Sequence, residues 1–119
     1  MQYWVAVAGG GAVGALLRGW VSQWALWHRI APFPGATALV NIIGCLLIGL
    51  LWNLLPPTAG TLRGLILTGL LGALTTFSTY ALETVRLLQT DQTLTALFYL
   101  GVNNVIGLAA VWLGLRLGG

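Results

Sequence analysis

The sequence has few charged residues and no lysine. Only 6% of its 119 residues are charged, whereas 58% are hydrophobic. This balance excludes an ordinary soluble globular domain, in which about a quarter of the residues are charged. The basic residues are five arginines scattered along the chain, and the acids are Glu83 and Asp91. Because the net charge of +3 is not concentrated in a basic cluster, we expect no nucleic-acid partner.

Cysteine and histidine are equally scarce. Cys45 is the single cysteine, so no intrachain disulfide can form, and we expect it to pack as a small apolar residue. The single histidine, His28, lies beside Arg29 at a predicted turn, which supports neither a catalytic triad nor a histidine metal site. The two acids are too few for paired-carboxylate catalysis. The sequence therefore argues against an enzyme.

Long apolar segments occupy the rest of the chain. A bilayer core of about 30 Å needs roughly 20 apolar residues per helix. On that scale the sequence predicts four membrane helices, at about 3–27, 35–55, 62–88 and 94–117. The N-terminal residues lack the basic region of a cleaved signal peptide, so we expect the first helix to stay in the mature protein. The prediction is a single four-helix domain, residues 1–119, of an all-α multi-pass protein surrounded by lipid in the inner cell membrane.

Arginines are divided almost evenly between the two ends of these helices. Arg63 and Arg116 lie on one side and Arg29 and Arg86 on the other, with Arg18 further inside the first helix. An arginine excess in short loops normally sets the orientation of a membrane protein. Because the arginine bias between the two ends is so small, the sequence predicts that the protein inserts into the membrane in both orientations. We infer a dual-topology protein that forms an antiparallel homodimer, with its two-fold axis in the membrane plane.

Glycines recur at four-residue spacing, as at Gly10 and Gly14, and such pairs let membrane helices approach closely. Gly9, Gly11 and Gly14 also match a dinucleotide-binding pattern. The acidic residue that should follow about 20 positions later is missing. We therefore interpret these glycines as packing positions.

Several polar side chains fall inside the predicted membrane helices, where polar groups are costly and often functional. Asn41 has two interpretations, a hydrogen bond to a neighbouring helix or an amide that points into a pore. Tyr99 and Asn103 are four residues apart and share a helix face. Asn104 is expected to point elsewhere and to join two helices.

The densest polar stretch, "GLLGALTTFSTYALE", covers residues 69–83. Its run of β-branched and self-capping residues after Gly72 predicts a local break in the third helix. A broken membrane helix exposes carbonyl and N–H groups, and it is tolerated where it lines a polar cavity. Exposed carbonyls suit a hard cation, whereas exposed N–H and hydroxyl groups suit an anion.

Three blocks, "GGGAVGALLRGW", "GATALVNIIGCLLIG" and "GLLGALTTFSTYALE", resemble the signature blocks of the CrcB/Fluc fluoride channels. The resemblance extends over essentially the whole chain. It implies an antiparallel homodimer that exports fluoride passively and lowers cytoplasmic fluoride toxicity. It also implies one structural Na⁺ at the dimer centre, which is not transported. The Na⁺ ligands would be the backbone carbonyls of Gly72 and Thr75 from both subunits.

The resemblance also implies the residues of the ion pathway. Asn41 matches the pore asparagine, and Phe77 matches the first ring of an aromatic box. Tyr80 stands where the second ring is usually phenylalanine, and Asn103 where serine is common. Arg18 matches an arginine that anchors a vestibule or a helix end. The implied pathway residues are Asn41, Phe77, Ser78, Thr79, Tyr80, Glu83, Tyr99 and Asn103.

Two other functions compete with this one. A small proton-coupled multidrug exporter also has four helices and dual topology, but its mechanism needs a carboxylate inside the membrane. The first predicted helix contains Arg18 and no acid. In an assembly subunit that transports nothing, all the polar residues would serve contacts between helices.

Overall fold

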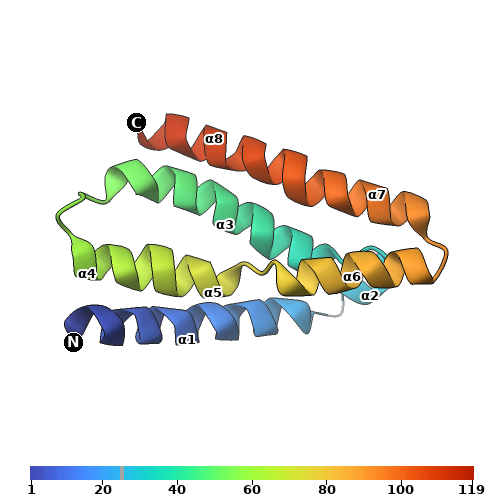
Figure 1. Ribbon diagram of the computed structural model, residues 1–119, viewed down its shortest axis with the longest axis horizontal. Helices are drawn as coiled ribbons and strands as arrows, with labels where there is room; N and C mark the ends of the chain where they lie inside the picture. The colour runs from blue at the N-terminus through green and yellow to red at the C-terminus, as the bar shows by residue number, and fades with distance from the viewer. Residues whose placement is uncertain (25) are drawn as a thin grey trace.

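In the computed structural model, residues 1–24 and 26–119 are described. These residues form four long helical rods, each apolar and long enough to cross a membrane: Gln2–Ser22, Gly35–Leu54, Gly60–Gln89 and Thr93–Gly118. Successive rods run in opposite directions, and both termini lie at the same end of the bundle (Figure 1). The predicted all-α architecture with four membrane helices is confirmed.

The rods are divided into shorter elements. These are α1 (Gln2–Ser22), α2 (Leu26–Arg29), α3 (Gly35–Leu54), α4 (Gly60–Arg63), η1 (Gly64–Leu71), α5 (Gly72–Leu74), α6 (Ser78–Gln89), α7 (Thr93–Gly101), η2 (Val102–Ile106) and α8 (Gly107–Gly118). The two η elements are π-helical, a wider winding that is frequent at functional sites.

The first rod ends at Ser22 rather than near residue 27. Gln23 and Trp24 donate their backbone N–H groups to carbonyls three residues back, and Ser22 Oγ donates to Gly19 O. These tighter hydrogen bonds satisfy the last carbonyls and end the α-helix. The short α2 follows before the chain turns into α3.

The helices pack as two pairs. α1 lies against η1 and α5, and α3 lies against α8, while α6 and α7 contact each other near the far turn (Figure 1). Glycine brings the backbones together in both pairs. A Cβ atom added at Gly14 would collide with Leu70 O, and one added at Gly114 would collide with Leu46 O. The four-residue spacing of small residues therefore serves close helix packing.

The third rod is broken at residues 75–77. Thr75 has extended backbone angles, φ −85° and ψ 157°, and α6 begins only at Ser78. The predicted break after Gly72 is confirmed. It lies near the middle of the bundle and places the carbonyl end of α5 opposite the amide end of α6 (Figure 1). The negative end of one helix dipole and the positive end of the next therefore meet near the middle of the bundle.

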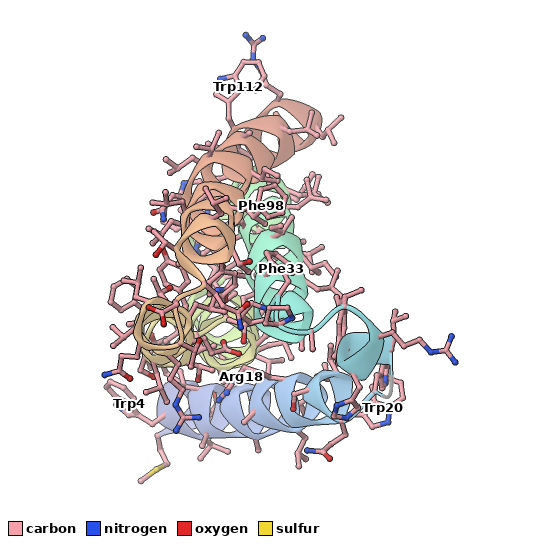
Figure 2. The ribbon with its side chains drawn as sticks, turned by 90° about the vertical axis from the view of Figure 1, so that its right-hand side faces the viewer. Trp4, Arg18, Trp20, Phe33, Phe98 and Trp112 are labelled. Carbon is pink, nitrogen blue, oxygen red and sulfur yellow. The ribbon has the colours of Figure 1, made fainter. Side chains whose placement is uncertain are left out.

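Tryptophan and arginine occur near both ends of the bundle. Trp20 and Trp24 pack edge to face where α1 ends, with 5.1 Å between their ring centroids. On α8, Arg116 lies over the Trp112 ring at 4.8 Å from its centroid. Figure 2 shows Trp20 and Trp112 on these separate helices. Tryptophan is enriched at both membrane interfaces and arginine in cytoplasmic loops, so their presence at both ends gives neither end a distinctive cytoplasmic signature.

Candidate functional site

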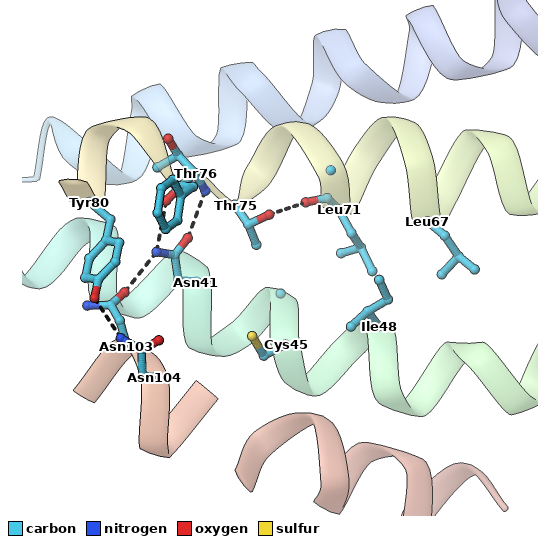
Figure 3. Close-up of a pocket in the computed structure, with 13 residues that line it drawn as sticks. Asn41, Cys45, Ile48, Leu67, Leu71, Thr75, Thr76, Tyr80, Asn103 and Asn104 are labelled. Atoms are coloured by element: carbon cyan, nitrogen blue, oxygen red, sulfur yellow. Dashed lines mark hydrogen bonds between the residues drawn. The ribbon is translucent and has the colours of Figure 1, made fainter. Parts of the chain in front are cut away.

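The break in the third rod borders a cavity of about 360 Å³. Its lining comes from α3, the third rod and η2. Polar side chains gather at one end of the cavity, and Ile48, Leu67 and Leu71 lie at the other (Figure 3). The polar lining consists of Asn41, Thr75, Thr76, Tyr80, Asn103 and Asn104.

Asn41 holds the broken segment in place. Its Oδ1 accepts a hydrogen bond from the Thr76 N–H at 2.9 Å, and its Nδ2 donates to Thr76 O at 3.2 Å. Nδ2 also donates to Asn103 Oδ1 at 2.9 Å, so this one amide joins three rods (Figure 3). Both of its hydrogens are engaged by the protein. The structure thus shows the contact between helices, and the pore role of Asn41 stays a prediction.

Carbonyl groups are exposed on the α5 side of the break. Ala73 O accepts a hydrogen bond from Arg18 Nε at 3.1 Å, so Arg18 anchors a helix end. Within residues 1–24 and 26–119, the carbonyl oxygens of Gly72 and Thr75 accept no hydrogen bond. Gly72 is exposed and Thr75 is half-buried. These two oxygens are therefore available to a cation or to a second chain.

The α6 side of the break presents donors. Thr79 N–H, in the first turn of α6, donates to Thr76 Oγ1 at 3.3 Å, so the Thr76 hydroxyl satisfies one of the N–H groups that a helix start leaves without a partner. Thr76 lines the larger cavity and also a smaller one of about 110 Å³, whose lining includes Arg18, Thr37 and Thr79. In Figure 2, Arg18 lies between α1 and the helices above it. Thr76 therefore borders both cavities.

A carboxylate beside these cavities joins α6 to α3 and α7. Glu83 Oε1 on α6 accepts hydrogen bonds from Thr37 Oγ1 at 2.6 Å and from Tyr99 Oη at 3.0 Å. Thr37 is buried, and Tyr99 is fully buried. Sequence reasoning does not single out Thr37, although it lies four residues before Asn41 and so on the same helix face.

Aromatic rings follow the polar end of the larger cavity. Phe77 and Tyr80 meet edge to face with 5.7 Å between centroids, and Tyr80 lies 5.3 Å from Tyr99. Tyr80 is buried, whereas Phe77 is 78% exposed near the middle of the bundle. The Phe77 and Tyr80 rings therefore contact each other at the start of α6.

Asn104 corrects one expectation from the sequence. It was expected to point away from Asn103, but both residues line the larger cavity. They belong to η2, and the wider winding of a π turn brings neighbouring side chains closer in direction than an α-helix does. Its role as a contact between helices is confirmed, because Asn104 Nδ2 donates to Tyr80 Oη at 2.7 Å.

The implied pathway residues fall at neighbouring but distinct places. The larger cavity is lined by Asn41, Phe77, Tyr80 and Asn103. Thr79 lines the smaller one, and Glu83 and Tyr99 bond to each other beside them. Ser78 is exposed and lines neither cavity. Assignment of these residues to a pathway stays a prediction.

Four apolar rods, with a cavity that has a polar end beside a helix break, define a small multi-pass membrane protein. A sequence profile described as "CrcB-like protein, Camphor Resistance (CrcB)" matches residues 5–115. The chain belongs to this CrcB-like family.

Relatives with the name "Fluoride-specific ion channel FluC" match the chain over nearly its full length. The protein of Azotobacter vinelandii is 47% identical over 116 residues, which cover 95% of this chain and 94% of the relative. The Stutzerimonas stutzeri protein is 46% identical over 117 residues, with coverages of 94% and 93%. The Pseudomonas putida protein is 44% identical over 115 residues, again with coverages of 94% and 93%. The resemblance read from the three sequence blocks is confirmed.

Proposed function

We propose that this protein is a fluoride-specific ion channel, which lets fluoride leave the cell down its electrochemical gradient. The observation that carries the proposal is the larger cavity, whose described lining has amide and hydroxyl groups but no lysine or arginine. Fluoride is small and strongly hydrated, so it crosses only where strong hydrogen bonds replace its water. A fully charged cation would hold the ion too tightly for rapid release.

The proposed route follows Thr76, because this residue borders both cavities. Thr79 receives the anion on one side, and Asn41 and Asn103 contact it on the other. The side-chain amides of Asn41 and Asn103 each exchange a hydrogen bond within the protein for a hydrogen bond to the ion. Phe77 and Tyr80 then present the positive edges of their rings, an interaction weak enough to let the ion move on.

Ser78, Glu83 and Tyr99 complete the proposed pathway. Ser78 supplies a hydroxyl on the exposed face of the break. The Glu83 carboxylate is held by the hydroxyls of Thr37 and Tyr99, at 2.6 Å and 3.0 Å. We infer that this hydrogen-bonded carboxylate sets the width and the polarity of the route beside it.

The proposed functional unit is an antiparallel homodimer. An exposed carbonyl at Gly72 would be costly against lipid, because hydrocarbon offers it no hydrogen bond. The exposed Phe77 ring lies at the same break. A second copy covers both groups. The even division of arginine between the two ends supports the opposite insertion of this copy.

The proposed dimer contains one structural Na⁺ at its centre. Unwound backbone carbonyls are typical Na⁺ ligands in membrane proteins. The Gly72 and Thr75 carbonyls fit this role, since neither accepts a hydrogen bond within the described residues. The ion supplies positive charge to the carbonyl groups from the two subunits. It is part of the structure and is not transported.

Fluoride efflux from liposomes tests the proposed function. Purified protein is reconstituted with internal fluoride, and external fluoride is followed with an ion-selective electrode, with and without an imposed proton gradient. We expect rapid loss of fluoride that does not depend on the proton gradient. A rate that follows the gradient would indicate a proton-coupled transporter, and absence of fluoride release would support an assembly subunit.

Withdrawal of Na⁺ is expected to weaken the dimer. An ion that binds only the assembled state at 100 times its Kd contributes about 2.7 kcal/mol to stability. Protein exchanged from NaCl into KCl should therefore show a lower thermal midpoint and a larger monomer fraction. Size-exclusion chromatography with light scattering measures the oligomer, and the constant chloride concentration serves as the anion control. A dimer of equal stability in both salts would contradict the Na⁺ proposal while leaving the fluoride test unaffected.

A further inference from the structure

Tyr80 and Asn104 form a hydrogen-bonded pair in the wall of the larger cavity (Figure 3). Asn104 Nδ2 donates to Tyr80 Oη at 2.7 Å and to Leu100 O at 3.0 Å. The Leu100 carbonyl is only an acceptor, so this bond fixes which end of the amide faces the phenol. Asn104 is therefore held on its own helix while it donates to the phenol oxygen.

The Tyr80 ring is held as firmly as its oxygen. The residue is 8% exposed, and its ring contacts the rings of both Phe77 and Tyr99. With the ring and the oxygen fixed, the remaining freedom of the hydroxyl is rotation of its own proton. Tyr80 thus places a hydroxyl group at a defined point of the cavity wall.

The hydroxyl proton of Tyr80 has no acceptor among the described residues, since the bond to Asn104 uses the phenol oxygen as acceptor. An amide that donates to a hydroxyl polarises it and makes it a stronger donor. The nearby Asn41 amide differs in this respect, because both of its hydrogens are already engaged. Tyr80 is consequently a donor that meets an anion without giving up a bond within the protein.

We propose that Tyr80 is an anion-binding residue of this channel, which donates its hydroxyl hydrogen bond directly to the ion. Asn104 is the positioning residue, which directs that hydroxyl into the cavity. This inference rests on the proposed function and names a donor for its anion. A short O–H···anion bond favours a small anion of concentrated charge, because charge-assisted hydrogen bonds are the strong ones.

A purely structural role for the pair has a different consequence. If the bond only tied α6 to η2, its loss would lower the thermal midpoint and leave the interaction with the ion unchanged. The fourth rod is already attached to α6 through the bond from Tyr99 to Glu83 at 3.0 Å. Variants at the two positions therefore separate anion binding from stability.

The test compares wild type with Tyr80→Phe, Asn104→Leu and the double variant in liposomes. We expect Tyr80→Phe to raise the half-saturating fluoride concentration about tenfold, the effect of losing one hydrogen bond to an ion. Asn104→Leu should raise it about threefold, because the hydroxyl remains but is no longer polarised or directed. The double variant should match Tyr80→Phe alone, since Asn104 acts through the hydroxyl.

Tyr3→Phe is the matched control, because Tyr3 lies on α1, where it contacts Trp4 and not the cavity lining. It should retain the wild-type half-saturating concentration. The proposal is overturned if Tyr80→Phe keeps that concentration too, or if its only change is a lower thermal midpoint. Additive effects of the two single variants would also overturn the positioning role of Asn104. Failure of the proposed function is a separate result, because wild-type liposomes would then release no fluoride.

Discussion

Replacement of Asn41 by aspartate is expected to slow fluoride efflux about a hundredfold, equivalent to about 2.7 kcal/mol. The amide donates to Thr76 O at 3.2 Å and to Asn103 Oδ1 at 2.9 Å. An aspartate has neither donor and sets a carboxylate against both of these acceptor oxygens. It also puts a negative charge on the proposed path of an anion, where like charges repel. Initial efflux rates from liposomes, corrected for the amount of reconstituted protein, measure the loss.

Asn53→Asp is the matched control for this variant. Asn53 is an exposed residue near the end of the same helix, α3, and its Nδ2 donates to Leu115 O at 3.2 Å. The same change of amide to carboxylate there should leave the efflux rate close to wild type. Wild-type efflux from Asn41→Asp would remove Asn41 from the pathway. An equal loss in both variants would show that any added carboxylate on α3 impairs the protein.

The membrane fold is predictable because its causes are local. Apolar length alone identifies four rods, since each must cross a hydrocarbon layer of roughly constant thickness. The break is predictable for a similar reason, because the threonines of "TTFST" disfavour a continuous helix through their own backbone preferences. The structure places that break at residues 75–77, close after Gly72. The end of α1 at Ser22 is harder to predict, because apolar residues continue beyond it.

The site is less predictable because its bonds join distant parts of the chain. No local pattern indicates that Thr37 Oγ1 donates to Glu83, which lies 46 positions away. The orientation of Asn104 depends on the π turn of η2, whereas the expectation assumed a regular α-helix. Asn41 shows how far the sequence alone predicts a site residue. Its type and depth indicate an important amide, but only the fold shows that it binds both Thr76 and Asn103.

The break brings two kinds of polar group to one place, and their roles differ. Carbonyl oxygens remain at the end of α5, whereas hydroxyl and amide groups surround the start of α6. Arg18 binds the carbonyl of Ala73, whereas the carbonyls of Gly72 and Thr75 accept no hydrogen bond from the residues that the structure describes. A cation and an anion can therefore be bound close together without competing for the same groups. The proposed Na⁺ and the proposed fluoride route depend on this separation.

Replacement of Glu83 by alanine is expected to lower the free energy of unfolding by about 3 kcal/mol. Thr37 Oγ1 and Tyr99 Oη both donate to this carboxylate, and each loses its acceptor in the variant. A buried donor left without a partner costs about 1–3 kcal/mol. Tyr99 is fully buried, so water does not replace the missing acceptor. Thermal or denaturant unfolding of the purified protein in detergent measures the difference.

Two further variants show whether the lost stability comes from the unpaired hydroxyls. Glu83→Gln keeps a carbonyl oxygen as acceptor, so it should lose only about 1 kcal/mol, the net value of a weakened hydrogen bond. Asp91→Asn is its matched control at the only other acid, which is exposed, and should change stability by less than about 0.5 kcal/mol. Adding Tyr99→Phe to Glu83→Ala should restore about 1 kcal/mol, because it removes the buried hydroxyl that has no partner. If Tyr99→Phe instead destabilised the Glu83→Ala variant further, the loss would have to come from packing around Tyr99 and not from its hydrogen bond.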